Sequence, residues 1–254
     1  MVRFRRVISM KSPYLLTRSN GSRLTTLRGA LALDGFALVK LLGQGRFGCS
    51  YLISREDQDY VAKIFHPNDV KRRKRKLNWE IKFLRTIDHS AIPKLIQVID
   101  RDGCFGLVMQ KMPGQTLEDW LACDYAFGKS EIAIIFFQLI AVMDYLADLG
   151  ISHRDIKADN ILWTGDQLSL IDFGSARKML SFDTHFNPDF WGIGDVFMRL
   201  ALSCEEITAS FNNGGIEQFD LTEEELLVIK RLLHIEKPYP NFRVLRAAVK
   251  QHWT

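Results

Sequence analysis

Residues 153–174 read HRDIKADNILWTGDQLSLIDFG, and this stretch decides how the rest of the chain is interpreted. It places charged and amide side chains between apolar residues that are expected to be buried. A simple hydrophobic core avoids such a sequence, because a buried charge without a partner is costly. We therefore expect these residues to carry chemistry in addition to packing.

The spacing of the polar groups suits phosphoryl transfer. Asp155 could accept the proton of an attacking hydroxyl, and Lys157 could neutralise charge on the phosphoryl group in transit. Asn160 and Asp172 offer the oxygen ligands that Mg²⁺ prefers. A plain acidic turn before a strand could also hold the two aspartates as solvated residues. The other parts of such a site occur upstream in the right order, which favours the chemical interpretation.

The stretch resembles the catalytic loop and the Asp-Phe-Gly metal site of protein kinases at every functional position. The resemblance implies an α+β, bilobal fold with a small antiparallel β-sheet lobe carrying one main helix, and a larger, mostly helical lobe. It implies ATP and Mg²⁺ as cofactors, with Asp155 and Lys157 catalytic and Asn160 and Asp172 as metal ligands. Lys157 also favours Ser/Thr over Tyr as the substrate residue.

Three apolar or aromatic neighbours acquire roles by the same resemblance. Leu162 would close the floor of the adenine pocket. His153 and Phe173 would pack beneath the site, so we expect a structural role for this histidine ahead of an acid or base role.

Composition bounds the class of protein. The chain has 254 residues, enough for one large or one two-lobed domain that buries about 70% of its unfolded surface. Its four cysteines show no metal-ligand or redox spacing, which predicts inert thiols in a reduced, cytoplasmic setting. The longest apolar run, residues 132–143, is too short to span a bilayer and predicts a buried core helix.

The N-terminal segment holds the positive charge. Residues 1–33 contain seven basic and no acidic residues, so the remaining chain has a net charge of −3 within the total of +4. We expect a flexible arm that is either solvated or in contact with an acidic partner, nucleic acid or an anionic lipid surface. Its composition would also suit an organelle transit peptide.

A glycine-rich loop lies between two expected strands of residues 36–65. A dinucleotide-binding loop would open a helix, but the residues that follow continue as a strand, as in the kinase lid over ATP phosphates. Glycines let backbone N–H groups approach phosphate oxygens closely. The resemblance assigns nucleotide contacts to Gly43, Gln44, Gly45, Arg46, Phe47 and Gly48.

The resemblance assigns Lys63 to the ATP phosphates and Glu80 to a pair with Lys63 that fixes its position, so both count as catalytic residues. Glu80 could instead bond Lys76, four residues earlier in the same expected helix. The basic run 71–76 is expected to be solvated. Apolar residues at helical spacing follow it, which predicts an amphipathic helix.

The remaining nucleotide contacts are implied around the connection between the lobes. Met109 would be the gatekeeper, and the backbones of Gln110 and Met112 would meet the adenine edge. Ser50 and Val61 stand where the family usually has Val and Ala. We hypothesise that this exchange conserves the volume of the pocket.

The helical lobe departs from the family after Gly174. Only sixteen residues separate Asp172 from Asp189, and no Ala-Pro-Glu follows, so the activation segment is expected to be mostly deleted, as in compact bacterial relatives. Asp189 would support the catalytic-loop backbone, and Arg243 lacks its usual glutamate partner. Ser130 is expected to cap the long helix that precedes the catalytic loop.

The expected organisation is an arm at residues 1–33, an N-lobe at 34–112 and a C-lobe at 113–254, with one kinase domain from 34 to 254. The favoured function is transfer of the ATP γ-phosphate to a protein Ser or Thr, without need of loop phosphorylation. A small-molecule or lipid kinase is an alternative that Arg154 and Lys157 disfavour. A nucleotide-binding pseudokinase scaffold is the other, although it would not need both the base and the metal ligands.

Overall fold

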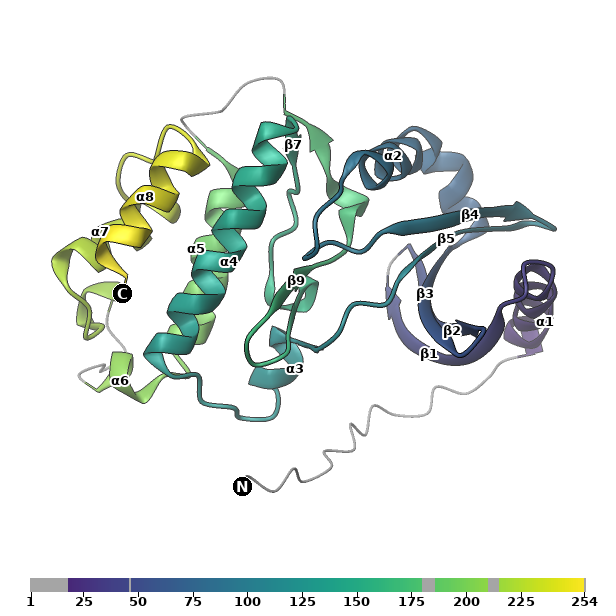
Figure 1. The fold of residues 1–254 in the computed structure, drawn as a ribbon, viewed down its shortest axis with the longest axis horizontal. Helices are drawn as coiled ribbons and strands as arrows, with labels where there is room; N and C mark the ends of the chain where they lie inside the picture. Colours follow the sequence, from purple (N-terminus) through teal and green to yellow (C-terminus); the bar gives the residue numbers. More distant parts are fainter. Residues whose placement is uncertain (1–17, 46, 180–185, 210–214, 254) are drawn as a thin grey trace. The chain divides into compact units, whose positions relative to one another are not determined.

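The computed structural model describes residues 18–45, 47–179, 186–209 and 215–253 (Figure 1). The chain divides into two units, one formed by residues up to 72 with 95–111, the other by residues 73–94 and those from 112 onward. The predicted α+β fold is confirmed. Residues 73–94 were expected in the N-lobe but group with the second unit, where Ala91 O accepts from Leu170 N and Tyr145 OH bonds the backbone of Asp88.

The first unit is built on a five-stranded antiparallel sheet with strand order β1-β2-β3-β5-β4. Two-residue turns at Glu56-Asp57 and Asp102-Gly103 have positive φ throughout, as the twist of a tight hairpin requires. The strands are β1 (Ala37–Gly45), β2 (Gly48–Arg55), β3 (Gln58–Phe65), β4 (Leu95–Arg101) and β5 (Cys104–Gln110).

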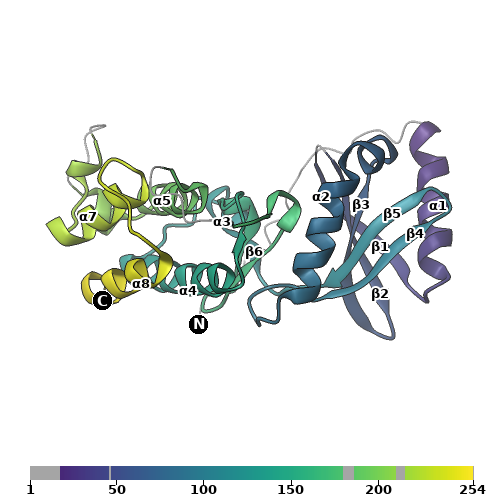
Figure 2. The ribbon, with the colours of Figure 1, turned by 90° about the horizontal axis from the view of Figure 1, so that it is seen from above.

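Helix α1 (Arg18–Ala32) covers one face of this sheet and lies beside it in Figure 2. Leu27, Ala30 and Leu31 are buried there against sheet residues such as Ile53 and Val108. The expected flexible arm is therefore wrong for residues 18–32, while residues 1–17 lie outside the described part of the chain.

The turn after α1 is held to the sheet by charge and by a ring contact. Asp34 accepts from Gln97 Nε2 at 2.6 Å and pairs with Arg101 at 2.9 Å. The Arg55 guanidinium lies 4.4 Å from the centroid of the Phe36 ring. These contacts make α1 a part of the first unit's core.

Shortening a buried α1 residue is expected to destabilise the protein. Leu31→Ala removes a side chain that is 0% exposed and should lower the free energy of unfolding by about 2–5 kcal/mol. Leu33→Ala is the matched control, since Leu33 is 68% exposed and its loss should change stability by less than about 0.5 kcal/mol. Urea unfolding compares the two. Equal effects would show that α1 does not pack on the sheet in solution.

Helix α2 (Pro67–Thr86) begins in the first unit and continues in the second. The apolar stripe predicted from its spacing is buried at Leu77, Leu84 and Ile87. The described side chains of its basic run, Lys71, Arg72, Arg75 and Lys76, are exposed as expected.

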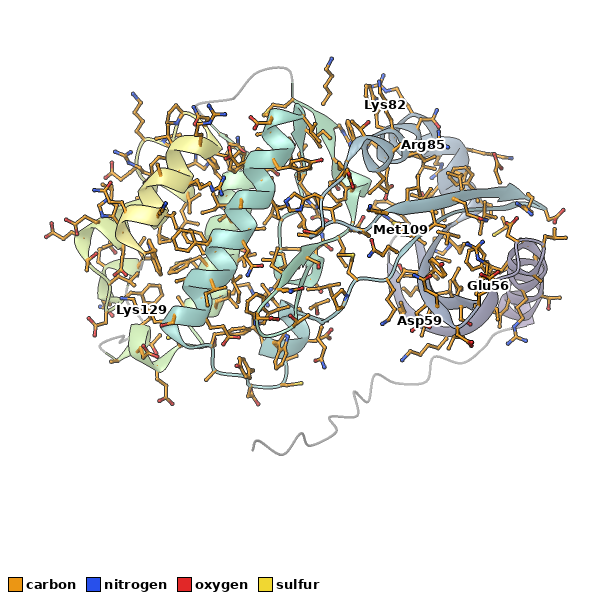
Figure 3. The ribbon with its side chains drawn as sticks, viewed as in Figure 1. Glu56, Asp59, Lys82, Arg85, Met109 and Lys129 are labelled. Atoms are coloured by element: carbon orange, nitrogen blue, oxygen red, sulfur yellow. The ribbon has the colours of Figure 1, made fainter. Side chains whose placement is uncertain are left out.

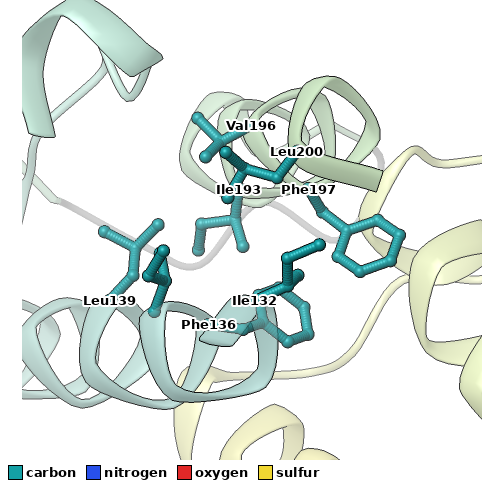
Figure 4. Close-up of a pocket in the computed structure, with 8 residues that line it drawn as sticks. Ile132, Phe136, Leu139, Ile193, Val196, Phe197 and Leu200 are labelled. Atoms are coloured by element: carbon teal, nitrogen blue, oxygen red, sulfur yellow. The ribbon is translucent and has the colours of Figure 1, made fainter. Parts of the chain in front are cut away.

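Helix α4 (Lys129–Asp148) is the centre of the second unit. It packs against α5 (Pro188–Ala201) and α8 (Phe242–His252), and the apolar side chains between α4 and α5 face one another in Figure 4. By length and composition α4 could cross a membrane, the one such helix in the described part of the chain, but eight of its residues are buried within the unit.

The expected cap at Ser130 is wrong, because the helix begins one residue earlier and its N-cap is Gly128.

Short elements connect these helices and carry the loops of the second unit. They are β6 (Gln115–Thr116), α3 (Leu117–Leu121), β7 (Ile151–Ser152), η1 (Ala158–Asn160), β8 (Ile161–Trp163), β9 (Leu168–Leu170), η2 (Phe173–Ser175), β10 (Arg177–Lys178), α6 (Glu205–Thr208), η3 (Ile216–Gln218) and α7 (Glu223–Leu232).

Candidate active site

The loop between β7 and β8 brings three of the predicted polar residues together. Lys157 Nζ lies 3.2 Å from Asp155 Oδ2. Asn160 Nδ2 donates to Asp155 Oδ2 at 2.9 Å and to the Asp155 backbone oxygen at 2.8 Å. Asp155 is half-buried, and the two donors hold its carboxylate in one orientation. A proton acceptor needs such a fixed position relative to the attacking hydroxyl.

A hairpin then carries the two predicted metal ligands to one end. Strands β8 and β9 pair in antiparallel register, and Ile171 N donates to Asn160 O at 2.9 Å. Asp172 follows directly, in a left-handed conformation with φ 65° and ψ 82°, and its Oδ1 accepts from Gly174 N at 3.1 Å. A left-handed conformation is uncommon for a non-glycine residue and often marks a functional site.

The donor set of this hairpin suits magnesium. Asn160 uses its Nδ2 toward Asp155, so its amide oxygen is the atom that could serve as a ligand, beside the Asp172 carboxylate. Among the described residues no three His, Cys, Asp or Glu side chains are grouped so that they could hold a metal ion. Two protein ligands are enough for Mg²⁺, because it keeps several water or phosphate oxygens.

His153 lies beneath the catalytic loop as a neutral packing residue. It is 0% exposed, and its ring meets that of Phe173 edge-on at 4.8 Å. Burial lowers the pKa of His153, and the nearby Asp189 carboxylate opposes this shift. Its Nε2 lies 3.2 Å from Ile171 O, so the neutral ring carries its proton on Nε2 and donates it. The expected packing of His153 and Phe173 is confirmed.

His153 should make the protein less stable in acid. Below about pH 6.5 the unfolded chain binds a proton that the folded chain cannot, so stability is complete above that pH and falls as pH decreases toward the lowered pKa. Between pH 7.5 and 5.5 the loss is at most about 1.4 kcal/mol. His153→Phe should remove this part of the pH dependence in urea unfolding. An unchanged pH slope in the variant would contradict the neutral assignment.

Asp189, at the start of α5, holds the backbone of the catalytic loop. Its carboxylate accepts from Ser152 Oγ at 2.7 Å, His153 N at 3.1 Å and Arg154 N at 2.5 Å. Arg154 has a positive φ of 66°, a conformation that this bond helps to hold. The role expected for Asp189 is confirmed.

The first unit places the predicted nucleotide residues on one face of its sheet. Register pairs Lys63 with Ser50 and Leu107, and Val61 with Met109 (labelled in Figure 3). Because side chains alternate along a strand, Ser50, Val61, Lys63 and Met109 share the face opposite to the one that α1 covers. The compensation between Ser50 and Val61 stays a hypothesis.

The glycine-rich loop is the turn between β1 and β2, where Gly45 pairs with Gly48. A Cβ on Gly48 would lie 2.1 Å from the Ile64 backbone oxygen, so only glycine fits there. Gly43 and Gln44 are exposed, Phe47 is half-buried, and Arg46 lies outside the described residues.

The other residues predicted to contact the nucleotide or to position Lys63 are divided between the two units. Gln110 is exposed at the end of β5 in the first unit. In the second unit Met112 is 8% exposed, and Leu162 is half-buried in β8. Glu80 is buried there at 3% exposure, whereas Lys63 belongs to the first unit, so their pairing stays a prediction.

Sequence reasoning missed two contributors. Gly192 in α5 packs so closely on the catalytic loop that a Cβ would lie 2.7 Å from Ile156 Cβ and from its backbone oxygen. Asn187 caps α5, accepting from Asp189 N at 2.9 Å and Phe190 N at 3.3 Å. An Asn before a Pro is a recognisable start signal for a helix, so this cap could have been predicted.

Comparisons with known proteins identify the family. The protein kinase domain family matches residues 36–214. The probable serine/threonine-protein kinase YbdM of Bacillus subtilis (strain 168) is 31% identical over 228 residues, which cover 86% of this chain and 89% of that protein.

Other relatives match a smaller part of this chain. Serine/threonine-protein kinase GE16371 of Drosophila yakuba is 31% identical over 152 residues, 57% of this chain and 20% of that protein. Calcium-dependent protein kinase 6 of Plasmodium berghei (strain Anka) is 31% identical over 145 residues, 54% of this chain and 10% of that protein. The fold, the loop geometry and these matches define a protein kinase. The chain belongs to the Hanks-type serine/threonine kinases.

Proposed function

We propose that this kinase transfers the γ-phosphate of ATP to Ser or Thr of a protein in a magnesium-dependent reaction. The observation that carries the proposal is the geometry of the catalytic loop, where Lys157 and Asn160 hold the Asp155 carboxylate. Asp155 would orient the hydroxyl and accept its proton, and Lys157 would offset negative charge on the phosphoryl group.

Asn160 and Asp172 would hold magnesium, which neutralises phosphate charge when bound. In the first unit Lys63 would bind the phosphates, while Glu80 would position it. A cytoplasmic location belongs to the same proposal and is supported by four free cysteines, Cys49, Cys104, Cys123 and Cys204.

Labelled ATP tests the proposal directly. The full chain is incubated with ATP labelled at the γ-phosphate, with and without a generic basic protein, in magnesium and after chelation by EDTA. We expect label on Ser or Thr of protein in magnesium and at least a hundredfold less after chelation. Label on a small molecule or lipid headgroup, or nucleotide binding without transfer, would overturn the proposal.

We also propose that activity does not require phosphorylation of the activation segment. The support is the short connection between Asp172 and Asp189, in which only three hydroxyl residues remain, Ser175, Ser181 and Thr184. Ser181 and Thr184 lie outside the described residues.

Replacing all three hydroxyl residues with Ala is therefore expected to leave kcat within about twofold of the wild type. The measurement is initial-rate transfer to the basic protein by both proteins as purified, without phosphatase treatment, so that any phosphate on the wild type is retained. A loss of tenfold or more in the triple variant would show that a phosphorylated residue is needed.

A further inference from the structure

The end of α7 has a residue in an unfavourable conformation. Leu233 is the C-cap, Ile235 N donates to Lys230 O at 2.9 Å, and His234 N lies 3.4 Å from Arg231 O. These two bonds form a Schellman motif, whose residue after the cap is usually glycine because it must be left-handed. Here that residue is His234, with φ 58°.

The imidazole of His234 reaches the start of α5. Its Nε2 lies 3.2 Å from both the backbone N and the backbone O of Asn187. The oxygen already accepts from Trp191 N at 3.1 Å, the first bond of the helix. The N–H has no such helical partner and Asn187 is 5% exposed, so a ring nitrogen that accepts from this N–H satisfies it.

Aromatic packing and close helix contact support the same arrangement. The Phe186 ring lies 5.1 Å from the His234 ring. A Cβ on Gly194 would come within 2.8 Å of Leu233, so α5 and the end of α7 are pressed together beside this bond. A strained residue that persists in such surroundings suggests a function for its side chain.

Asn187 connects His234 to the catalytic loop. Its side chain caps α5 through Asp189 N, and the Asp189 carboxylate holds the backbone of residues 152–154. Arg243, near the C-terminus, lacks the glutamate of an Ala-Pro-Glu segment as its partner. Its side chain is 80% exposed and pairs with the exposed Asp148 carboxylate at 3.9 Å. Among the described residues its ion-pair partner is therefore this aspartate in α4, and not a residue at the start of α5.

We propose that His234 is a positioning residue for the catalytic loop. Its imidazole holds the start of α5, the role that the absent Ala-Pro-Glu part of the activation segment would otherwise have. The inference rests on the proposed kinase activity. His234 touches neither the substrate nor the cofactor in this role. It acts through Asn187 and Asp189 on the conformation of the loop that contains Asp155.

His234→Gly separates positioning from stability. Glycine suits the left-handed site and thereby offsets much of the loss of the hydrogen bond, so the midpoint of urea unfolding should stay close to that of the wild type. The hydrogen bond is lost, and kcat should fall about five- to tenfold with KM for ATP changed less than twofold. His234→Gln, which offers an acceptor to the Asn187 N–H, should recover kcat to within about threefold. A wild-type kcat in His234→Gly, or a loss that Gln does not recover, would overturn the proposal.

Amide hydrogen exchange gives a readout independent of phosphoryl transfer. In His234→Gly the peptides covering 150–156 and 187–191 should exchange at least fivefold faster, while β3 in the first unit is unchanged. Unchanged exchange in both peptides rejects the positioning role even if transfer is robust. If the wild type transfers no phosphate, the proposed function fails, and the exchange result alone decides the role of His234.

Discussion

Asp155→Asn is expected to lower kcat for protein phosphorylation by about 10²–10⁴-fold, the usual contribution of a positioned acid or base. The variant keeps the size of the side chain but loses the carboxylate that Lys157 and Asn160 hold. Nucleotide affinity should change less than about threefold, because no nucleotide contact is assigned to this residue. Single-turnover transfer and binding of a fluorescent ATP analogue measure the two quantities.

Asp159→Asn is the matched control for this experiment. Asp159 is an exposed carboxylate four residues further along the same loop, so its loss changes the local charge equally. It should retain kcat within about twofold. If the two variants lost activity equally, the effect would come from loop charge, and Asp155 would not be the proton acceptor.

Gly192→Ala is expected to have the second largest effect. The added Cβ would lie 2.7 Å from Ile156, the neighbour of Asp155 in the chain, so the loop or the helix must move. A shift of about 1 Å at a reacting group can reduce the rate about a hundredfold. The free energy of unfolding should also fall by about 1–3 kcal/mol through overpacking. The higher helix propensity of Ala relative to Gly offsets part of this loss.

Gly29→Ala in α1 controls for that helix preference. A Cβ there meets nothing within 4 Å, so this variant should keep full activity and gain up to about 1 kcal/mol of stability. Shortening Ile156 to Ala should not rescue Gly192→Ala, because the close atoms are the Cβ and the backbone oxygen. Rescue by Ile156→Ala, or wild-type activity in Gly192→Ala, would show that the contact is not rigid.

The catalytic loop could be predicted because its functional groups are neighbours in sequence. Asp155, Lys157 and Asn160 lie within six residues, and one hairpin joins them to Asp172. The strands of the first unit were predictable for a similar reason, since each hairpin turn is two residues long. Both the catalytic loop and these strands could therefore be predicted from residues that are close together in the sequence.

Longer contacts could not be read from one sequence. His234 and Asn187 are separated by 47 positions, and the sequence around either residue contains no signal that predicts a contact with the other. Helix α1 was missed for a different reason. Leu24, Leu27 and Leu31 do follow helical spacing, but the surrounding basic and hydroxyl residues resemble those of a flexible segment.

The packing of α1 has a practical consequence for how this enzyme is produced. The family match starts at residue 36, so a truncated version that begins there would lose the whole helix. Ile53, Tyr60 and Val108 would then be exposed to solvent as one continuous hydrophobic patch on an otherwise intact sheet. Such a surface promotes self-association, so a shortened protein would precipitate or aggregate and could be mistaken for an inactive enzyme.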